Sequence, residues 1–286
     1  MTPPASQSAL TRHAITFIIA RALAACLTLA AVVAQYSQSL AFWLAHDENI
    51  GFRTTNFFSF FTIESNLIAM ITLAIGAVLL MRGCTIDPQW FAVLRASAIT
   101  YMVITGIVYN ILLRNETLSQ GVTVWWSNEV LHLIVPIYMV VDWLFAPGAR
   151  RVQWRTVFYV AAFPVVWVAY TMLRGPLAID PFTGVGWYPY PFLQPANGGY
   201  GSVMVYIVII AVALVVVAAG VVAVWRRNGA SDVARSGQRF GGRHGRRRRH
   251  CRGGGRSLRR RGLSSRRRGS RALRLARDLG TGRARL

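Results

Sequence analysis

The chain has 286 residues, of which 54% are apolar and only 15% are charged, and its mean hydropathy is +0.39. A soluble domain carries about 25% charged residues, so this composition argues against a soluble globular enzyme. The formal net charge of +22 is unevenly distributed, because 22 of the 32 basic residues lie in 226–286. The chain therefore consists of a nearly neutral, apolar body and a polycationic C-terminal tail.

Six apolar segments of the body are long enough to cross a membrane. A helix needs about 20 apolar residues to span the hydrocarbon core. The sequence predicts an all-α integral membrane protein, with a six-transmembrane-helix bundle over 14–225. The predicted spans are 14–34, 57–81, 90–113, 124–145, 154–173 and 201–225. An alternative interpretation of the first segment is a signal peptide that is cleaved after Ala34.

The placement of the arginine residues along the chain predicts the orientation of the bundle. With six crossings, eight of them fall on one side and three on the other, and the arginine-rich side faces the cytoplasm. We therefore expect a multi-pass protein of the cell membrane whose N-terminal segment 1–13 and C-terminus are both cytoplasmic. The eight are Arg12, Arg82, Arg95, Arg150, Arg151, Arg155, Arg226 and Arg227, and the three are Arg53, Arg114 and Arg174.

The tail, 226–286, contains a single aromatic residue and several runs of arginine. Such a segment cannot bury enough apolar surface to fold, so we expect it to be disordered. One interpretation is adhesion to anionic lipid headgroups or nucleic acid, although no specific nucleic acid partner is predicted. A solvated tail without a dedicated role is a second interpretation. A third is an out-of-frame reading of a GC-rich gene, which yields arginine, glycine, alanine and serine without lysine.

His132 is the one histidine of the body that lies deep in an apolar segment. Ionisable groups within the hydrocarbon usually face a bundle interior or a cavity. On a helix, Asn128 and Pro136 stack one turn before and one turn after His132, and Glu129 precedes it by three residues. We expect Asn128 or Glu129 to contact the imidazole and to determine its tautomer. The simpler alternative is a histidine that only hydrogen-bonds a neighbouring helix.

The second span begins with a group of small polar residues. Thr62, Ser65 and Asn66 share one helix face, whereas Glu64 points elsewhere and needs a partner such as Arg53 or Arg114. Both this span and the fourth enter the membrane from the outside. At 1.5 Å per residue, Thr62 and His132 lie roughly 8 and 12 Å below the outer boundary, so a contact between them is expected to be possible.

These motifs, in this order, resemble those of the androgen-induced family of multispanning membrane hydrolases and their bacterial relatives. Phe60-Phe61-Thr62 is similar to the family's threonine motif, and Asn128 and His132, followed by Pro136, are similar to its histidine motif. A third similar segment contains Trp187 and Tyr190-Pro191-Phe192-Leu193. The resemblance implies cleavage of fatty acid esters of hydroxy fatty acids, with Thr62 as the nucleophile and His132 as the base.

Four further residues are candidates for contact with the substrate, which is expected to be a membrane lipid or a lipid ester: Asn66, Asn128, Glu129 and Tyr190. Asn66 and Asn128 are also candidate donors to an oxyanion. No metal and no cofactor are required by this chemistry, and no metal-ligand spacing is visible. The competing interpretation is a non-enzymatic lipid-binding or transport protein that uses the same cavity. The oligomeric state is not predicted.

The orientation can be tested by single-cysteine labelling in intact cells. We expect a cysteine that replaces Leu118 to react with an impermeant maleimide from outside. A cysteine that replaces Arg150 should react only after permeabilisation, because arginine-rich loops remain in the cytoplasm. The reverse pattern would overturn the assignment of Thr62 and His132 to the outer half of the membrane.

Overall fold

The computed structural model describes residues 11–84, 86–114 and 122–239, and of 227–239 it describes only the backbone. These residues form helices joined by loops, and their only strand-like pairings are the isolated bridges Ile86–Gly148 and Ile179–Gly186. The helices are α1 (Arg12–Ala45), α2 (Ile50–Phe58), α3 (Phe61–Met81), α4 (Gln89–Val108), α5 (Trp125–Glu129), α6 (Val135–Phe145), α7 (Thr156–Arg174) and α8 (Gly199–Arg239).

Two π-helical turns interrupt the regular helices. Tyr109–Leu113 (η1) continues α4, and Val130–Ile134 (η2) joins α5 to α6. Two short 3₁₀ turns, Pro191–Leu193 (η3) and Pro195–Asn197 (η4), lie in the loop before α8. Counted with their π turns, six helical segments are long and apolar enough to cross a membrane. The prediction of six apolar spans is confirmed at this level.

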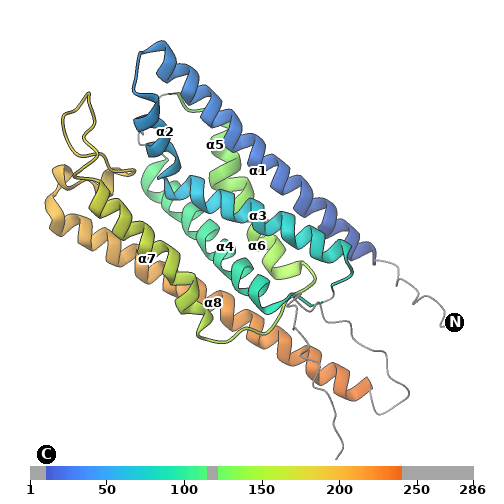
Figure 1. Ribbon diagram of the computed structural model, residues 1–286. Helices are drawn as coiled ribbons and strands as arrows, with labels where there is room; N and C mark the ends of the chain where they lie inside the picture. Colours follow the sequence, from blue (N-terminus) through green and yellow to red (C-terminus); the bar gives the residue numbers. More distant parts are fainter. Residues whose placement is uncertain (1–10, 85, 115–121, 240–286) are drawn as a thin grey trace, which may run out of the picture. The chain divides into compact units, whose positions relative to one another are not determined.

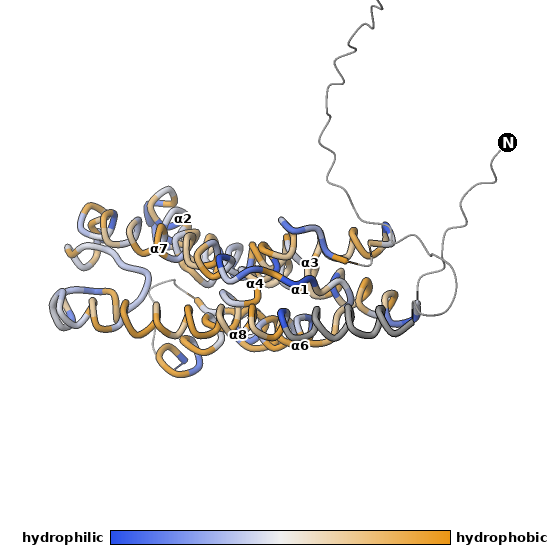
Figure 2. Tube along the Cα trace, turned by 90° about the horizontal axis from the view of Figure 1, so that it is seen from below, coloured by the Kyte–Doolittle hydropathy of each residue, from blue (hydrophilic) through white to orange (hydrophobic). Residues whose placement is uncertain are grey.

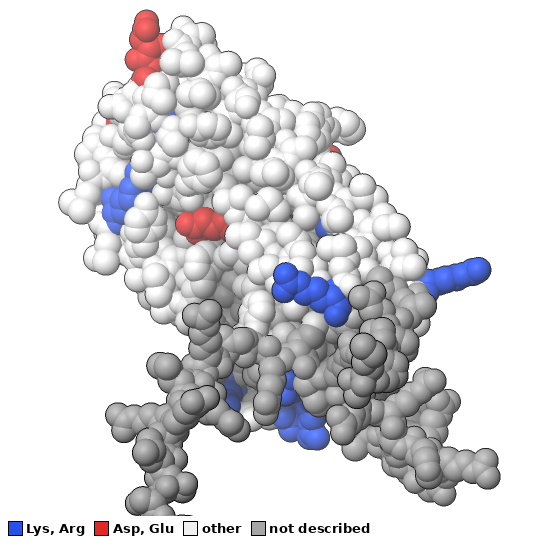
Figure 3. All heavy atoms as spheres, turned by 45° about the vertical axis from the view of Figure 1, so that its right-hand side comes forward, with Lys and Arg blue, Asp and Glu red and all other residues white. Residues whose placement is uncertain are grey.

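Helix α4 is the most enclosed of the six spans and contacts α3, α6, α7 and α8 (Figure 1). Helix α1 packs mainly against α3 and α5, on the opposite side of α3 from α7 and α8. Hydrophobic residues dominate most of the helical segments (Figure 2). On the face drawn in Figure 3, charged atoms are few and widely separated. An apolar exterior of this kind suits a bilayer, in which lipid chains replace water around the helices.

Three of the predicted span boundaries change in the structure. The first span extends well beyond 14–34, because α1 continues without interruption to Ala45. The predicted span 57–81 is divided at Ser59 and Phe60 into α2 and α3. The last helix continues to Arg239 instead of ending near 225. Extending an existing helix avoids the cost of nucleation, which explains this continuation. The rest of the tail, 240–286, lies outside the described residues.

A buried cluster of four charged residues connects several helices of the bundle. Arg21 of α1 donates to both carboxylate oxygens of Asp142 on α6, at 2.7 and 3.2 Å. Arg95 of α4 donates to the Asp142 carboxylate at 3.1 Å and to Asp87 at 2.9 Å. All four side chains are at most 2% exposed. The cluster thus joins three spans and the loop before α4.

Two glycines leave room for this cluster. A Cβ atom on Gly76 of α3 would lie 2.7 Å from the Arg21 guanidinium, and one on Gly148 would lie 2.4 Å from the Asp87 carboxylate. Arg95, one of the eight arginines expected on the cytoplasmic side, is a buried residue of α4. Without Arg95, seven arginines still lie on the side expected to be cytoplasmic, against three on the other side.

We expect Asp142→Ala to destabilise the protein severely, because it leaves two buried guanidinium groups without their shared carboxylate. Loss of one partner of a buried ion pair costs about 3–5 kcal/mol. Thermal unfolding of the purified protein in detergent measures the change. Glu129→Ala is the matched control, since Glu129 lies in the same span but pairs with Arg114, whose side chain is 43% exposed. Equal melting temperatures for the two variants would contradict a stabilising role of the cluster.

Candidate active site

Thr62 lies in the first turn of α3, directly after the break that separates α2 from α3. The hydroxyl of Ser59 donates to the carbonyl of Thr55, and the indole of Trp167 donates to the carbonyl of Ser59 at 3.1 Å. Phe60 then adopts an extended conformation and caps α3 without a side-chain hydrogen bond. The first backbone N–H groups of a helix have no intrahelical partner and carry the positive end of its dipole. Thr62 is thus buried beside a helix N-terminus.

His132 lies in the π turn η2 and reaches Thr62 across the interface between the two spans. Its Nδ1 atom is 2.9 Å from the carbonyl oxygen of Asn128, and its Nε2 atom is 3.3 Å from the Thr62 hydroxyl. A carbonyl oxygen can only accept, so Nδ1 carries the proton of the neutral ring. Nε2 is therefore left with a free lone pair that faces the hydroxyl of Thr62.

Pro136 explains how this π turn is held. Proline has no N–H, so one backbone carbonyl of the preceding turn loses its helical donor. The side-chain amide of Asn66 donates to the carbonyl of Leu131 at 3.2 Å, and the amide of Asn110 donates to the carbonyl of His132 at 3.3 Å. Both of these carbonyls thus accept from side chains of neighbouring spans. Because π turns occur frequently at functional sites, the local distortion agrees with a special role for His132.

Tyr190, from the loop before α8, completes a chain of hydroxyl groups. Its hydroxyl accepts the Thr62 N–H at 3.2 Å and lies 3.3 Å from the Thr62 hydroxyl. The ring packs edge-on against Phe60 and parallel to Phe192. Burial raises the pKa of Tyr190 to about 12, so the phenol stays protonated at neutral pH. The phenol proton of Tyr190 can therefore be donated to the oxygen of the Thr62 hydroxyl, which lies within hydrogen-bond distance.

Tyr109 supports the histidine from its other side, and no sequence pattern marked it as a site residue. Its ring stacks on the imidazole of His132 with a centroid separation of 3.8 Å and an interplanar angle of 23°. The side-chain amide of Asn128 donates to the Tyr109 hydroxyl. Tyr109 is the first residue of the π turn η1, which no sequence pattern predicted.

The structure gives three of the predicted polar residues other partners than expected. The amide of Asn66 donates to the carbonyls of Thr62 and Leu131, so its N–H groups are not free to bind an oxyanion. Asn128 contacts the imidazole through its backbone carbonyl, and its side chain binds Tyr109. Glu129 forms an ion pair with Arg114 at 2.6 Å. Neither the Asn128 side chain nor Glu129 therefore sets the tautomer of His132.

The expected pairing of Glu64 with an arginine is wrong. Arg53 instead forms ion pairs with Glu48 and, at 3.3 Å, with Asp180 of the outer loop. Arg114 pairs with Glu129, as described above. Glu64 lies half-buried on α3, and one of its carboxylate oxygens is enclosed without a hydrogen-bond partner.

Thr62 stands where two cavities meet. The first, of about 310 Å³, is apolar and lies between α4, α7 and α8. The second, of about 230 Å³, is polar and is lined by Gln35, Thr123, Asn128, His132 and Arg114, among others. Thr62, Tyr109 and Tyr190 line both. A molecule that carries an apolar chain and a polar group could thus present the bond between them to Thr62.

Within the ranges given above, no three His, Cys, Asp or Glu residues are grouped so that they could hold a metal ion. No family model matches the chain, and searches of the curated proteins and of the solved structures find no significant similarity. The function of the protein is therefore inferred from the geometry around Thr62 and from the motifs in the sequence.

We expect Asn66→Ala to destabilise the junction between α3 and η2, because it leaves the buried carbonyl of Leu131 without a donor. An unsatisfied buried group costs about 1–3 kcal/mol. Thr72→Ala is the matched control, since Thr72 is buried on the same helix but bonds only a carbonyl of its own helix. Thermal unfolding in detergent compares the two variants. If Asn66→Ala were no less stable than Thr72→Ala, another group would have to satisfy the carbonyl.

Proposed function

We propose that this protein is a membrane-embedded hydrolase of lipid esters, with Thr62 as the nucleophile and His132 as the general base. The observation that carries the proposal is the directed chain of hydrogen bonds at the meeting point of the two cavities. The tautomer of His132 leaves Nε2 free to take the proton of the Thr62 hydroxyl, 3.3 Å away. A threonine hydroxyl becomes an effective nucleophile only when a base removes its proton.

The reaction would proceed in two stages. In the first, Nε2 of His132 removes the Thr62 proton while Oγ1 attacks the ester carbonyl carbon. The tetrahedral intermediate collapses, the carbon–oxygen bond to the alcohol breaks, and His132 returns the proton to the departing alkoxide. In the second stage His132 removes a proton from water, which attacks the acyl-threonine. The products are the free fatty acid, the alcohol and the restored hydroxyl of Thr62.

Two features near Thr62 favour the negative charge that develops in this reaction. The phenol of Tyr190 is neutral and lies 3.3 Å from the reacting oxygen, so it can donate to that oxygen as it loses its proton. The N-terminus of α3 adds the positive end of the helix dipole. With Asn66 committed to backbone carbonyls, Tyr190 and the first turn of α3 are the better candidates for oxyanion stabilisation.

The class of substrate follows from the surroundings of the pair. The apolar cavity suits a fatty-acyl chain, and the polar cavity suits the alcohol part of the ester and the attacking water. The resemblance to the androgen-induced family supports the same assignment. Six spans and the arginine bias are consistent with a multi-pass protein of the cell membrane with both termini in the cytoplasm, and with a cationic tail near anionic headgroups.

We expect Thr62→Ala and His132→Ala each to abolish measurable ester hydrolysis, and Thr62→Ser to retain part of it. Removal of a general base lowers kcat by about 10²–10⁴-fold. The losses should not add in the double variant, because each removes the same chemical unit. Release of nitrophenol from nitrophenyl esters by the purified protein measures the rates. Thr72→Ala controls for loss of a threonine elsewhere on α3, since Thr72 lines neither of these cavities.

Two results would contradict the assignment in different ways. If both alanine variants retained hydrolysis, the reaction would take place at another site. If the wild-type protein hydrolysed no long-chain ester and Thr62→Ala bound lipid as tightly as wild type, the protein would be a lipid-binding or transport protein.

A further inference from the structure

The apolar cavity extends from Thr62 toward the middle of the membrane. Its outer end contains Thr62 and Tyr190, and its inner end contains Ala161 of α7 and Leu214 of α8. Along α8 the lining residues run from Ile207 to Val215, which corresponds to about 12 Å at 1.5 Å per residue. The polar side chains of the lining are concentrated at its outer end. The inner part is therefore shaped for an apolar chain.

The cavity is open at its side, between α7 and α8. Val165 of α7 and Val215 of α8 line it but are 66% and 45% exposed. Ala211, one turn before Val215 on α8, also lines the cavity and is exposed. Trp167 and Leu214 of the same two helices also line the cavity but are only 8% and 5% exposed, so they face the interior of the protein. In a bilayer the exposed rim faces the hydrocarbon chains of the lipids, so the opening leads into the membrane.

A specific contact joins α7 to α4 beside Ala161. Pro164 has no N–H, so the carbonyl of Val160 lacks its helical donor. The hydroxyl of Tyr101 on α4 donates to that carbonyl at 2.7 Å. The Tyr101 ring also packs against Phe163 of α7, at 5.4 Å between centroids. This contact holds the two helices together directly below Ala161.

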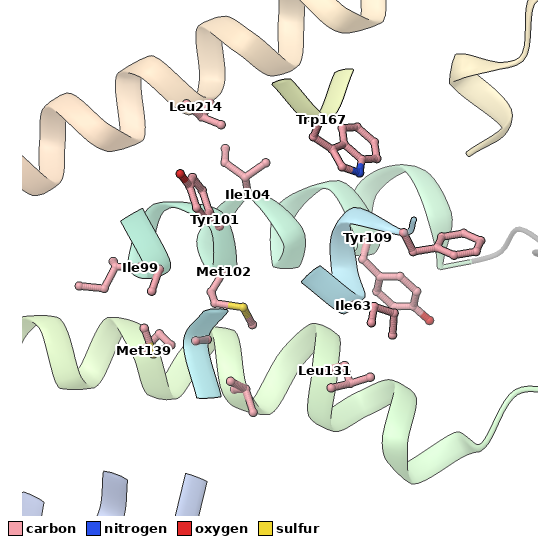
Figure 4. Packing of buried hydrophobic residues seen from close by; sticks show 14 of the residues in the cluster. Ile63, Ile99, Tyr101, Met102, Ile104, Tyr109, Leu131, Met139, Trp167 and Leu214 are labelled. Carbon is pink, nitrogen blue, oxygen red and sulfur yellow. The ribbon is translucent and has the colours of Figure 1, made fainter. Parts of the chain in front are cut away.

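The side chains at the inner end approach one another from both sides. Ile104 projects from α4 toward α8, where Leu214 projects back toward α4 (Figure 4). Ala161 contributes only a methyl group from α7, so it leaves space that a larger residue would fill. The depth of the apolar cavity therefore depends on Ala161 and Leu214, and its outer end lies at Thr62.

We propose that the acyl chain of a membrane lipid ester enters this cavity sideways between α7 and α8, and that Ala161 and Leu214 limit the length of chain accepted. The inference rests on the proposed function, because the chain is measured from the ester carbonyl at Thr62. An apolar chain that is already dissolved in the bilayer reaches Thr62 without crossing water. The polar remainder of the molecule then occupies the cavity beside His132.

The test compares hydrolysis of nitrophenyl butyrate, octanoate and palmitate by purified variants in detergent. Ala161→Leu should lower kcat/KM for palmitate about tenfold or more and change that for butyrate less than about twofold, since each excess methylene in a closed pocket is rejected about 10–200-fold. Leu214→Ala should shift the preference in the opposite direction. Ala162→Leu is the matched control, because Ala162 is the next residue on α7 and is exposed outside the cavity.

A second measurement does not depend on catalysis. A palmitic acid analogue with a diazirine in its chain, irradiated with the protein in vesicles, should label peptides of α7 and α8 that contain Val165 and Val215. Ala161→Leu should reduce this labelling, and Ala162→Leu should not. This measurement remains informative if Leu214→Ala or Ala161→Leu proves inactive for other reasons.

The outcomes separate the two proposals. Equal chain-length profiles for Ala161→Leu and Ala162→Leu, in a protein that hydrolyses esters through Thr62, would overturn the chain-length inference and leave the hydrolase standing. Labelling of other helices instead of α7 and α8 would overturn the sideways route. Labelling of α7 and α8 that Ala161→Leu reduces, without any hydrolysis by wild type, would support the chain site and refute the hydrolase.

Discussion

A membrane-spanning segment has no water to satisfy its backbone, so every carbonyl that a proline deprives of its donor must find another donor within the protein. Two intrahelical prolines create this demand here. Pro136 removes one donor from η2, where Asn66 and Asn110 donate to the carbonyls of Leu131 and His132. Pro164 frees the carbonyl of Val160, and Tyr101 binds it. The first set of bonds surrounds His132, and the second joins α4 to α7 beside Ala161.

These bonds also explain why α4 and its π turn are central to the molecule. Tyr101, Tyr109 and Asn110 all project from this one segment, toward α7, the imidazole of His132 and the η2 backbone in turn. A small movement of α4 would thus change both the depth of the cavity and the position of the imidazole. Close packing of this kind holds the groups around Thr62 in fixed positions, as the proposed catalysis requires.

Charge is divided between the two halves of the bundle. The deeply buried ion pairs of Arg21, Arg95, Asp87 and Asp142 join α1, α4 and α6 away from Thr62. The pair of Thr62 and His132 is surrounded mainly by neutral groups, and the charged Arg114 at the cavity edge is neutralised by Glu129. The ion pairs stabilise the frame, and the neutral surroundings leave the lone pair of His132 free to act on Thr62.

The sequence by itself determined the number of apolar spans and the similar depth of Thr62 and His132. Both depend on lengths and helical rise alone, which do not change with the packing. Tyr190 was also a candidate from its motif, and the structure brings it within hydrogen-bond distance of Thr62.

Other features were decided only by tertiary structure. The break at Ser59 and Phe60 interrupts an unbroken apolar run, because Trp167 from a distant helix binds the Ser59 carbonyl. The roles of Asn66 and Asn128 depend on which donors and acceptors the neighbouring spans leave unpaired. The pairing of Arg21 with Asp142 joins residues 121 positions apart in the chain. Hydropathy measures each segment in isolation, whereas these contacts form only when buried polar groups of different segments must satisfy one another.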